Sequence, residues 1–180
     1  MVFYINKTRI KIEYSFLLMI AFSVLMKNAN IAYLLLFSSL HEFGHLASLI
    51  AFKGRANEIN IAFYGIGLKY EYSFSYIKEI VFLSSGIAVN LLFCFIGVQS
   101  RINAALILIN ILPIYPLDGG RIVKLILNKL FLLDLSDRLF RLVSVTVLII
   151  LLLLSLYTKN YSLILISIYI IIFSCNNTPD

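Results

Sequence analysis

Long apolar stretches are the feature of this sequence that most limits how the chain can fold. Several approach the roughly 20 residues that an α-helix needs to cross the hydrocarbon core of a bilayer. We place six of them, at 14–26, 31–52, 80–98, 103–115, 139–157 and 161–175. Only 13% of the 180 residues are charged and 61% are hydrophobic, whereas soluble domains carry about a quarter charged residues. We therefore predict an all-α polytopic membrane protein with about six transmembrane helices, and we exclude a soluble enzyme.

The basic residues are unevenly distributed between the connections. Of the 15, 12 lie in the N-terminal segment and in the second and fourth connections. The positive-inside rule then predicts that both termini are cytosolic, which requires an even number of crossings. The net charge of +6 could indicate a nucleic-acid partner, but the basic residues form no dense run. We therefore expect the lipid bilayer as a partner and no nucleic acid.

One connection, residues 53–79, is long and contains a strand-like alternation over 59–72. This pattern predicts a short interfacial β-hairpin that turns near residues 65–67. Two roles stay open for it. Its aromatic residues are typical of an interfacial belt that anchors a loop, and its edge could also pair with an extended peptide by strand addition.

The chain's only two histidines flank a glutamate in the middle of an apolar stretch, as His41-Glu42-Phe43-Gly44-His45. A charge at this depth costs roughly 3 kcal/mol and indicates a functional site. On a helix, residues four apart share a face, so His41 and His45 can both bind one Zn²⁺, and Glu42 beside them can accept a proton from water activated by the metal. The alternative is a polar patch that links helices by hydrogen bonds.

A catalytic zinc site needs a third protein ligand, and Asp118 is the candidate at comparable depth. Taken alone, Asp118 could instead be the N-cap of a helix over 119–132. The segment 110–120 contains two prolines and two glycines, Pro113, Pro116, Gly119 and Gly120, which we expect to break the helix. Broken backbone at membrane depth lies inside protein or beside a watery cavity. Asn110 could donate a hydrogen bond to the substrate backbone or the oxyanion, or link helices instead. Pro116 and Gly119 are further candidates for contact with the substrate or oxyanion.

The sequence resembles the site-2 protease family of intramembrane zinc metalloproteases, and most closely its stage IV sporulation protein FB branch. The resemblance is carried by the motif at residues 41–45, by Gly86 with Asn90, for which packing alone is the alternative, and by the segment 110–121. It implies one Zn²⁺ held by His41, His45 and Asp118, with Glu42 as the general base. It also implies cleavage of membrane-associated protein substrates within or near the bilayer.

In the sporulation branch the substrate is a sigma-factor precursor, and membrane partner proteins inhibit the protease. The chain differs from many relatives in lacking a proline after Gly86. Its 180 residues leave no room for a CBS or PDZ domain, so we expect one intramembrane metalloprotease domain over 1–180. The competing interpretation is a non-catalytic membrane protein that binds or transports zinc through the same residues.

Overall fold

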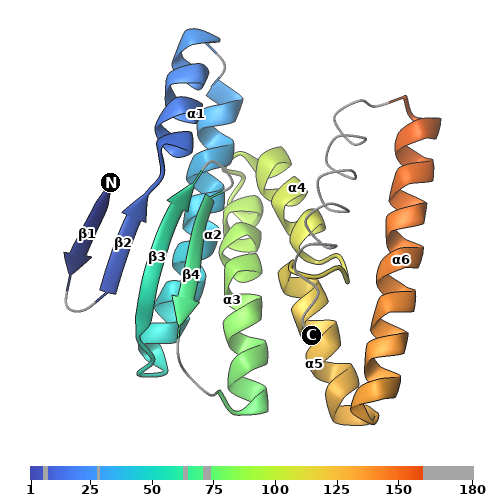
Figure 1. The fold of residues 1–180 in the computed structure, drawn as a ribbon. Coiled ribbons are helices and arrows are strands. Elements are labelled where there is room, and N and C mark those ends of the chain that lie inside the picture. The colour runs from blue at the N-terminus through green and yellow to red at the C-terminus, as the bar shows by residue number, and fades with distance from the viewer. Residues whose placement is uncertain (6–7, 28, 63–64, 71–73, 160–180) are drawn as a thin grey trace. The chain divides into compact units, whose positions relative to one another are not determined.

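The computed structural model describes residues 1–5, 8–27, 29–62, 65–70 and 74–159. Two compact units divide the chain, Met1–Leu108 and Ile109–Asp180. The first unit contains a four-stranded sheet and most of the described helices, and the second contains two long helices and the segment that precedes them (Figure 1). The predicted stretch at 161–175 lies outside the described residues.

The sheet of the first unit has the order β1-β2-β3-β4. Its strands are β1 (Val2–Ile5), β2 (Thr8–Ile12), β3 (Ala56–Ala62) and β4 (Gly65–Tyr70). The outer pairs are antiparallel, and β2 and β3 are parallel. In register across the three strands β2 to β4, Glu58 lies opposite both Arg9 and Lys69, with N–O distances of 3.8 and 3.7 Å. Opposite charges on neighbouring strands support this register.

The prediction of an all-α fold with one hairpin is wrong for the N-terminus. The hairpin is confirmed as β3 and β4, although residues 65–67, where the turn was expected, already belong to β4. The strands β1 and β2, which pair with each other antiparallel, were missed. The pairing of β2 with β3, about 50 residues further along the chain, is one that a local pattern does not reveal. The pairing is parallel because two helices separate β2 from β3 and return the chain to the same end of the sheet.

The helices of the first unit are α1 (Tyr14–Leu25), α2 (Ala29–Ala51), α3 (Tyr76–Phe95) and α4 (Ser100–Asn110), whose last two residues belong to the second unit. The two long helices α2 and α3 pack against each other closely at Gly44. A Cβ added there would lie 2.8 Å from the Ser85 carbonyl oxygen and 2.8 Å from Val89 Cγ2. Glycine at this position therefore allows the two helix backbones to approach.

In the second unit, α5 (Asp118–Leu130) and α6 (Leu133–Tyr157) follow a break in the helical backbone. The start of α5 packs directly on this break: a Cβ on Gly119 would lie 2.2 Å from the Ile111 carbonyl oxygen, and one on Gly120 would lie 2.4 Å from that of Ile114. The side chain of Ile114 is fully buried. The predicted break before Asp118 is confirmed, but the prediction that Gly119 and Gly120 break the helix is wrong, because both lie inside α5. They instead allow a helix end to pack against irregular backbone.

Three described helices, α2, α3 and α6, are long and apolar enough to cross a membrane. Helix α1 has 12 residues and rises only about 18 Å, less than the roughly 30 Å of a bilayer core. Large apolar side chains such as Leu91, Phe95 and Leu153 are more than half exposed, which suits contact with lipid. A multi-pass membrane protein is thus supported, while the number of six crossings stays a prediction.

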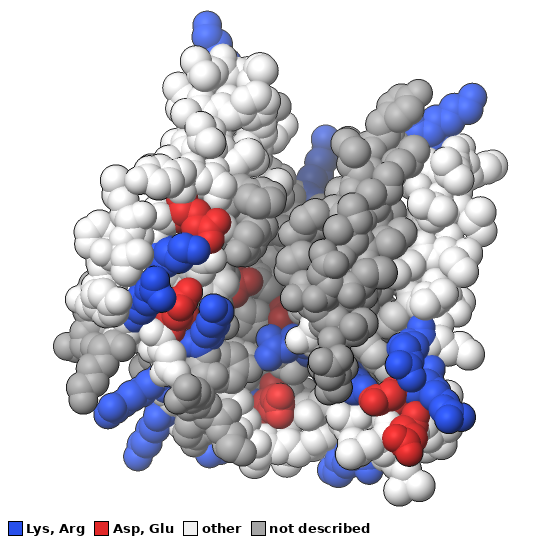
Figure 2. All heavy atoms as spheres, in the orientation of Figure 1, with Lys and Arg blue, Asp and Glu red and all other residues white. Residues whose placement is uncertain are grey.

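Charged side chains gather away from these apolar surfaces (Figure 2). In the first unit they lie over the sheet, where Glu13 accepts hydrogen bonds from Lys11 and Asn60, both at 3.0 Å. In the second unit they lie near the turn between α5 and α6, where Lys124 pairs with Asp137. Each unit therefore has a polar region suited to a membrane surface beside apolar helices.

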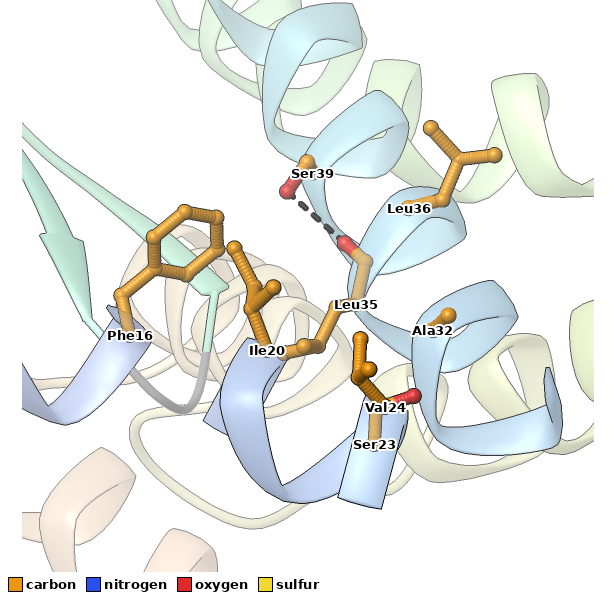
Figure 3. A pocket seen from close by; sticks show the side chains of 8 residues that line it. All are labelled: Phe16, Ile20, Ser23, Val24, Ala32, Leu35, Leu36 and Ser39. Atoms are coloured by element: carbon orange, nitrogen blue, oxygen red, sulfur yellow. Dashed lines mark hydrogen bonds between the residues drawn. The ribbon is translucent and has the colours of Figure 1, made fainter. Parts of the chain in front are cut away.

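A hollow of about 250 Å³ lies between α1 and α2 (Figure 3). It is lined by Phe16, Ile20, Ser23, Val24, Ala32, Leu35, Leu36 and Ser39. The Ser39 hydroxyl donates to the carbonyl of Leu35 in its own helix, at 2.8 Å. Since its lining contains no titratable side chain, this hollow has no groups for acid–base chemistry or metal binding, and the functional site must be sought elsewhere.

Candidate metal centre

His41 and His45 form the centre of the candidate site. Both lie on one face of α2, each is 4% exposed, and their Nε2 atoms are 3.3 Å apart. Two nitrogens that bind one tetrahedral zinc at about 2.0–2.1 Å are themselves about 3.3–3.4 Å apart. The pair therefore already has the separation that a shared zinc ion requires, while metal binding by the two imidazoles stays a prediction.

The orientation of His45 is set by the facing helix. Its Nδ1 lies 2.8 Å from the backbone carbonyl oxygen of Phe82 on α3. A carbonyl oxygen can only accept, so Nδ1 carries the proton and Nε2 keeps its lone pair. A ligating histidine usually has such a partner on its second nitrogen, and the partner fixes both tautomer and ring orientation. The backbone of α3 thus prepares His45 for metal binding.

Gly86 provides the space in front of both rings. A Cβ at this position would lie 2.5 Å from His45 Nε2 and 2.6 Å from His41 Nε2. Any side chain at position 86 would therefore occupy the space beside the two nitrogen atoms that face each other. The missing Cβ leaves a small cradle next to both candidate ligand atoms, which is a second observation that fits a bound ion.

Glu42 completes the cluster on α2. One of its carboxylate oxygens and one nitrogen of each imidazole all lie within 4.8 Å of one another. The residue is partly buried, and it lies about 100° around the helix from His41. A carboxylate next to the imidazole pair can accept a proton from a water molecule bound there. The cluster as described therefore fits the roles that the sequence predicted for its three members.

The other predicted site residues lie in the second unit. Asn110 ends α4, Pro116 lies in the break, and Asp118 and Gly119 begin α5. Asp118 is 7% exposed and is the first helical residue, while Leu117 takes the N-cap position without a side-chain cap. The alternative that Asp118 is the N-cap of the helix is therefore wrong, because the cap lies one residue earlier. Convergence of Asp118 and Asn110 on the imidazole pair stays a prediction.

Gly86 and Asn90 of α3 do more than pack against α2. Packing alone was the alternative interpretation that the sequence left open for them. Phe82, Gly86 and Asn90 are spaced four residues apart, so they form one stripe of α3 that faces the histidines of α2. The Asn90 amide nitrogen lies 3.4 Å from His41 Nδ1. The repeat of four, which matches the spacing of the histidines, is the signal from which these contacts could have been found.

Comparisons with known proteins bear on the family and the fold. Residues 71–154 match the model of Peptidase family M50, a segment that includes Gly86, Asn90 and Asp118 but not the histidines. The fold is similar to that of the site-2 protease from Methanocaldococcus jannaschii, with a TM-score of 0.67 and 23% sequence identity over 100% of this chain and 96% of that one. No curated protein gives a significant sequence match. The chain therefore has a site-2 protease fold, and the residues of α2 were identified independently of the matching segment.

Proposed function

We propose that this chain is an intramembrane zinc metalloprotease of the site-2 protease type, which hydrolyses peptide bonds of membrane-associated proteins. The observation that carries the proposal is the imidazole pair of His41 and His45, whose Nε2 atoms are 3.3 Å apart beside the cradle at Gly86. The match to Peptidase family M50 over residues 71–154 and the shared fold support it from other parts of the chain.

His41, His45 and Asp118 would hold the ion, a donor set of two imidazoles and one carboxylate that suits catalytic zinc. When bound, zinc would polarise the peptide carbonyl and lower the pKa of water. Glu42 takes a proton from the attacking water molecule while the water oxygen bonds to the peptide carbonyl carbon. Glu42 then gives that proton to the departing amine nitrogen as the C–N bond breaks. Asn110 holds the substrate backbone or the oxyanion by a hydrogen bond.

Several parts of the proposal rest on sequence alone. The distribution of basic residues supports cytosolic termini. The sequence resemblance supports the stage IV sporulation protein FB branch, with a sigma-factor precursor as substrate and membrane partner proteins as inhibitors. In this arrangement the hairpin of β3 and β4 either anchors the loop at the interface or pairs with the bound peptide.

The test compares the parent chain with Glu42→Gln, each expressed together with candidate membrane-associated precursors. The parent should release a product that Glu42→Gln does not, while both should hold one zinc per chain, because the amide keeps the shape of the carboxylate but cannot take a proton. Glu79→Gln, the same change at the start of α3, is the matched control and should cleave like the parent. Undiminished cleavage by Glu42→Gln would overturn the assignment of the base.

The same experiment separates a protease from a zinc-binding or zinc-transporting protein. A transporter would move zinc into liposomes and would leave every candidate precursor intact. The position of Glu42 favours hydrolysis, because a base beside the metal ligands serves proton transfer and is not needed to hold the ion.

A further inference from the structure

Asn90 is an unusual residue for the middle of an apolar helix. Its side chain is fully buried, and its NH₂ group lies 3.4 Å from His41 Nδ1. Its Oδ1 is buried and has no hydrogen-bond partner among the described residues. An orphaned buried acceptor destabilises the folded state, so its presence calls for an explanation.

The amide as placed fits one particular arrangement of protons. If the NH₂ group donates to Nδ1 of His41, that imidazole carries its proton on Nε2 and can donate to Nε2 of His45, 3.3 Å away. His45 in turn donates from Nδ1 to the Phe82 carbonyl oxygen. Three hydrogen bonds then run in one direction from Asn90 to Phe82, with both imidazoles neutral. In this arrangement the lone pair of His41 Nε2 is not available to a metal.

Metal binding requires the other tautomer of His41. With Nε2 on the ion, the ring proton lies on Nδ1 and needs an acceptor. The Asn90 amide lies beside this Nδ1, and its oxygen and nitrogen ends exchange places when the amide turns by about 180°. The orphaned oxygen then meets the ring N–H, and the NH₂ group enters the space that the oxygen leaves.

We propose, on the basis of the proposed zinc site, that Asn90 is the positioning residue of His41 and that its amide turns over when the metal binds. Its NH₂ group donates to Nδ1 when no ion is held, and its oxygen accepts the Nδ1 proton when the ion is held. His45 needs no such group, because the carbonyl of Phe82 accepts in both states. The two histidines thus differ in their needs. His45 has a fixed backbone acceptor, whereas His41 has a side chain that can both donate and accept.

The metal affinities of two variants test the role. In Asn90→Leu the amide that contacts His41 Nδ1 is lost from both states, so zinc affinity, measured by competition with a chelator in detergent, should fall about 10- to 100-fold. In Asn90→Asp an acceptor oxygen remains at the same place, so zinc should bind at least as tightly as to the parent. Parent affinity in Asn90→Leu, or equally weak binding in both variants, would overturn the proposal.

Asn103→Leu is the matched control. Asn103 on α4 is also fully buried with an orphaned Oδ1, but its NH₂ group donates to the Val98 carbonyl at 2.9 Å. This variant should lose stability without changing zinc affinity. Thermal unfolding of all variants, followed by circular dichroism, separates loss of the fold from loss of the site.

The tautomers can also be read directly. The chain contains only two histidines, so labelling with ¹⁵N-histidine gives four ring nitrogens in the NMR spectrum. Without metal, one ring should be protonated on Nε2 and the other on Nδ1, and with zinc both should be protonated on Nδ1. Protonation of both rings on Nδ1 already without metal would refute the turnover of the amide. A parent chain that binds no zinc would instead refute the proposed function.

Discussion

Replacement of Gly86 by alanine tests whether the space between the imidazoles is the metal site. The new methyl carbon would lie 2.5 and 2.6 Å from the two Nε2 atoms and 2.7 Å from His41 Cε1. Ordinary contacts of carbon with nitrogen or carbon are near 3.5 Å, so the rings or α3 must move by roughly 0.9 Å. His45 cannot move freely, because its Nδ1 donates to the Phe82 carbonyl at 2.8 Å.

The size of the effect follows from the cost of overpacking. Extra methyl groups in well-packed cores typically cost about 1–3 kcal/mol. If that strain opposes the geometry in which both imidazoles hold one ion, zinc affinity should fall roughly 5- to 150-fold, at about 1.4 kcal/mol for each factor of ten. The measurement is competition between the purified protein and a chelator of known affinity, together with the zinc content after dialysis.

A further glycine provides a control of the same chemical change. In Gly67→Ala the nearest atoms would be 3.8 and 4.0 Å away, in Asn60, so neither stability nor zinc affinity should fall. Zinc affinity in Gly86→Ala equal to that of the parent would refute the reasoning, as would an equal loss in Gly67→Ala.

Three further predictions concern other parts of the chain. Asp118→Ala should lower zinc affinity at least tenfold, measured by the same competition, because two imidazoles alone leave the ion without its charged ligand. Ser144→Ala removes a hydroxyl that donates to the Pro113 carbonyl at 2.8 Å, and it should lower the free energy of unfolding by about 1 kcal/mol. Glu13 has a pKa below its ordinary value of 4.5, mainly because Asn60 and then Lys11 donate hydrogen bonds to it. Its contribution to stability is therefore present above that value and lost as the pH falls through the lowered pKa, so Glu13→Gln should flatten the fall of thermal stability below the ordinary pKa of 4.5.

Each of these predictions has its own control and its own contrary result. Asp134→Ala changes an acid in the first turn of α6 and should keep zinc, and one zinc retained at parent affinity in Asp118→Ala would remove that residue from the ligand set. The control for Ser144→Ala is Thr146→Ala, which removes a hydroxyl that donates within its own helix at an exposed position. If both variants lowered the free energy of unfolding equally, the contact of Ser144 with Pro113 would contribute nothing. An unchanged pH profile in Glu13→Gln would show that its hydrogen bonds do not favour the ionised form.

The sequence predicted those parts of the site that depend on a single helix. Four-residue spacing brings His41 and His45 onto one face wherever the helix lies, so the 3.3 Å approach of their nitrogens follows from local geometry. The stripe of α3 opposite them depends on how two helices dock. Gly86 and Asn90 were therefore noticed in the sequence, but their contacts with the rings required the packed structure.

The fold shows the same division between local and distant contacts. The hairpin of β3 and β4 was recognisable because its two strands adjoin in sequence. The strands β1 and β2 also adjoin in sequence and pair with each other, but they were not recognised. Their place in the sheet depends on the pairing of β2 with β3, in which Arg9 and Glu58 join residues on either side of two helices. Basic residues near the N-terminus were interpreted only as a topology signal, although they also belong to a strand whose alternate side chains form ion pairs.

Two buried asparagines in apolar surroundings allow a final argument about the site. Each has an orphaned Oδ1, and in a membrane interior such an oxygen is not rescued by solvent. For Asn103 the compensation is structural, because its NH₂ group donates to the carbonyls of Val98 and Gln99 at 2.9 and 3.3 Å and secures the turn before α4. The Asn90 amide, by contrast, contacts an imidazole, that of His41. Its burial is therefore accounted for by the histidine it orients, and selection for packing alone would favour an apolar residue of similar size, such as leucine, at that position.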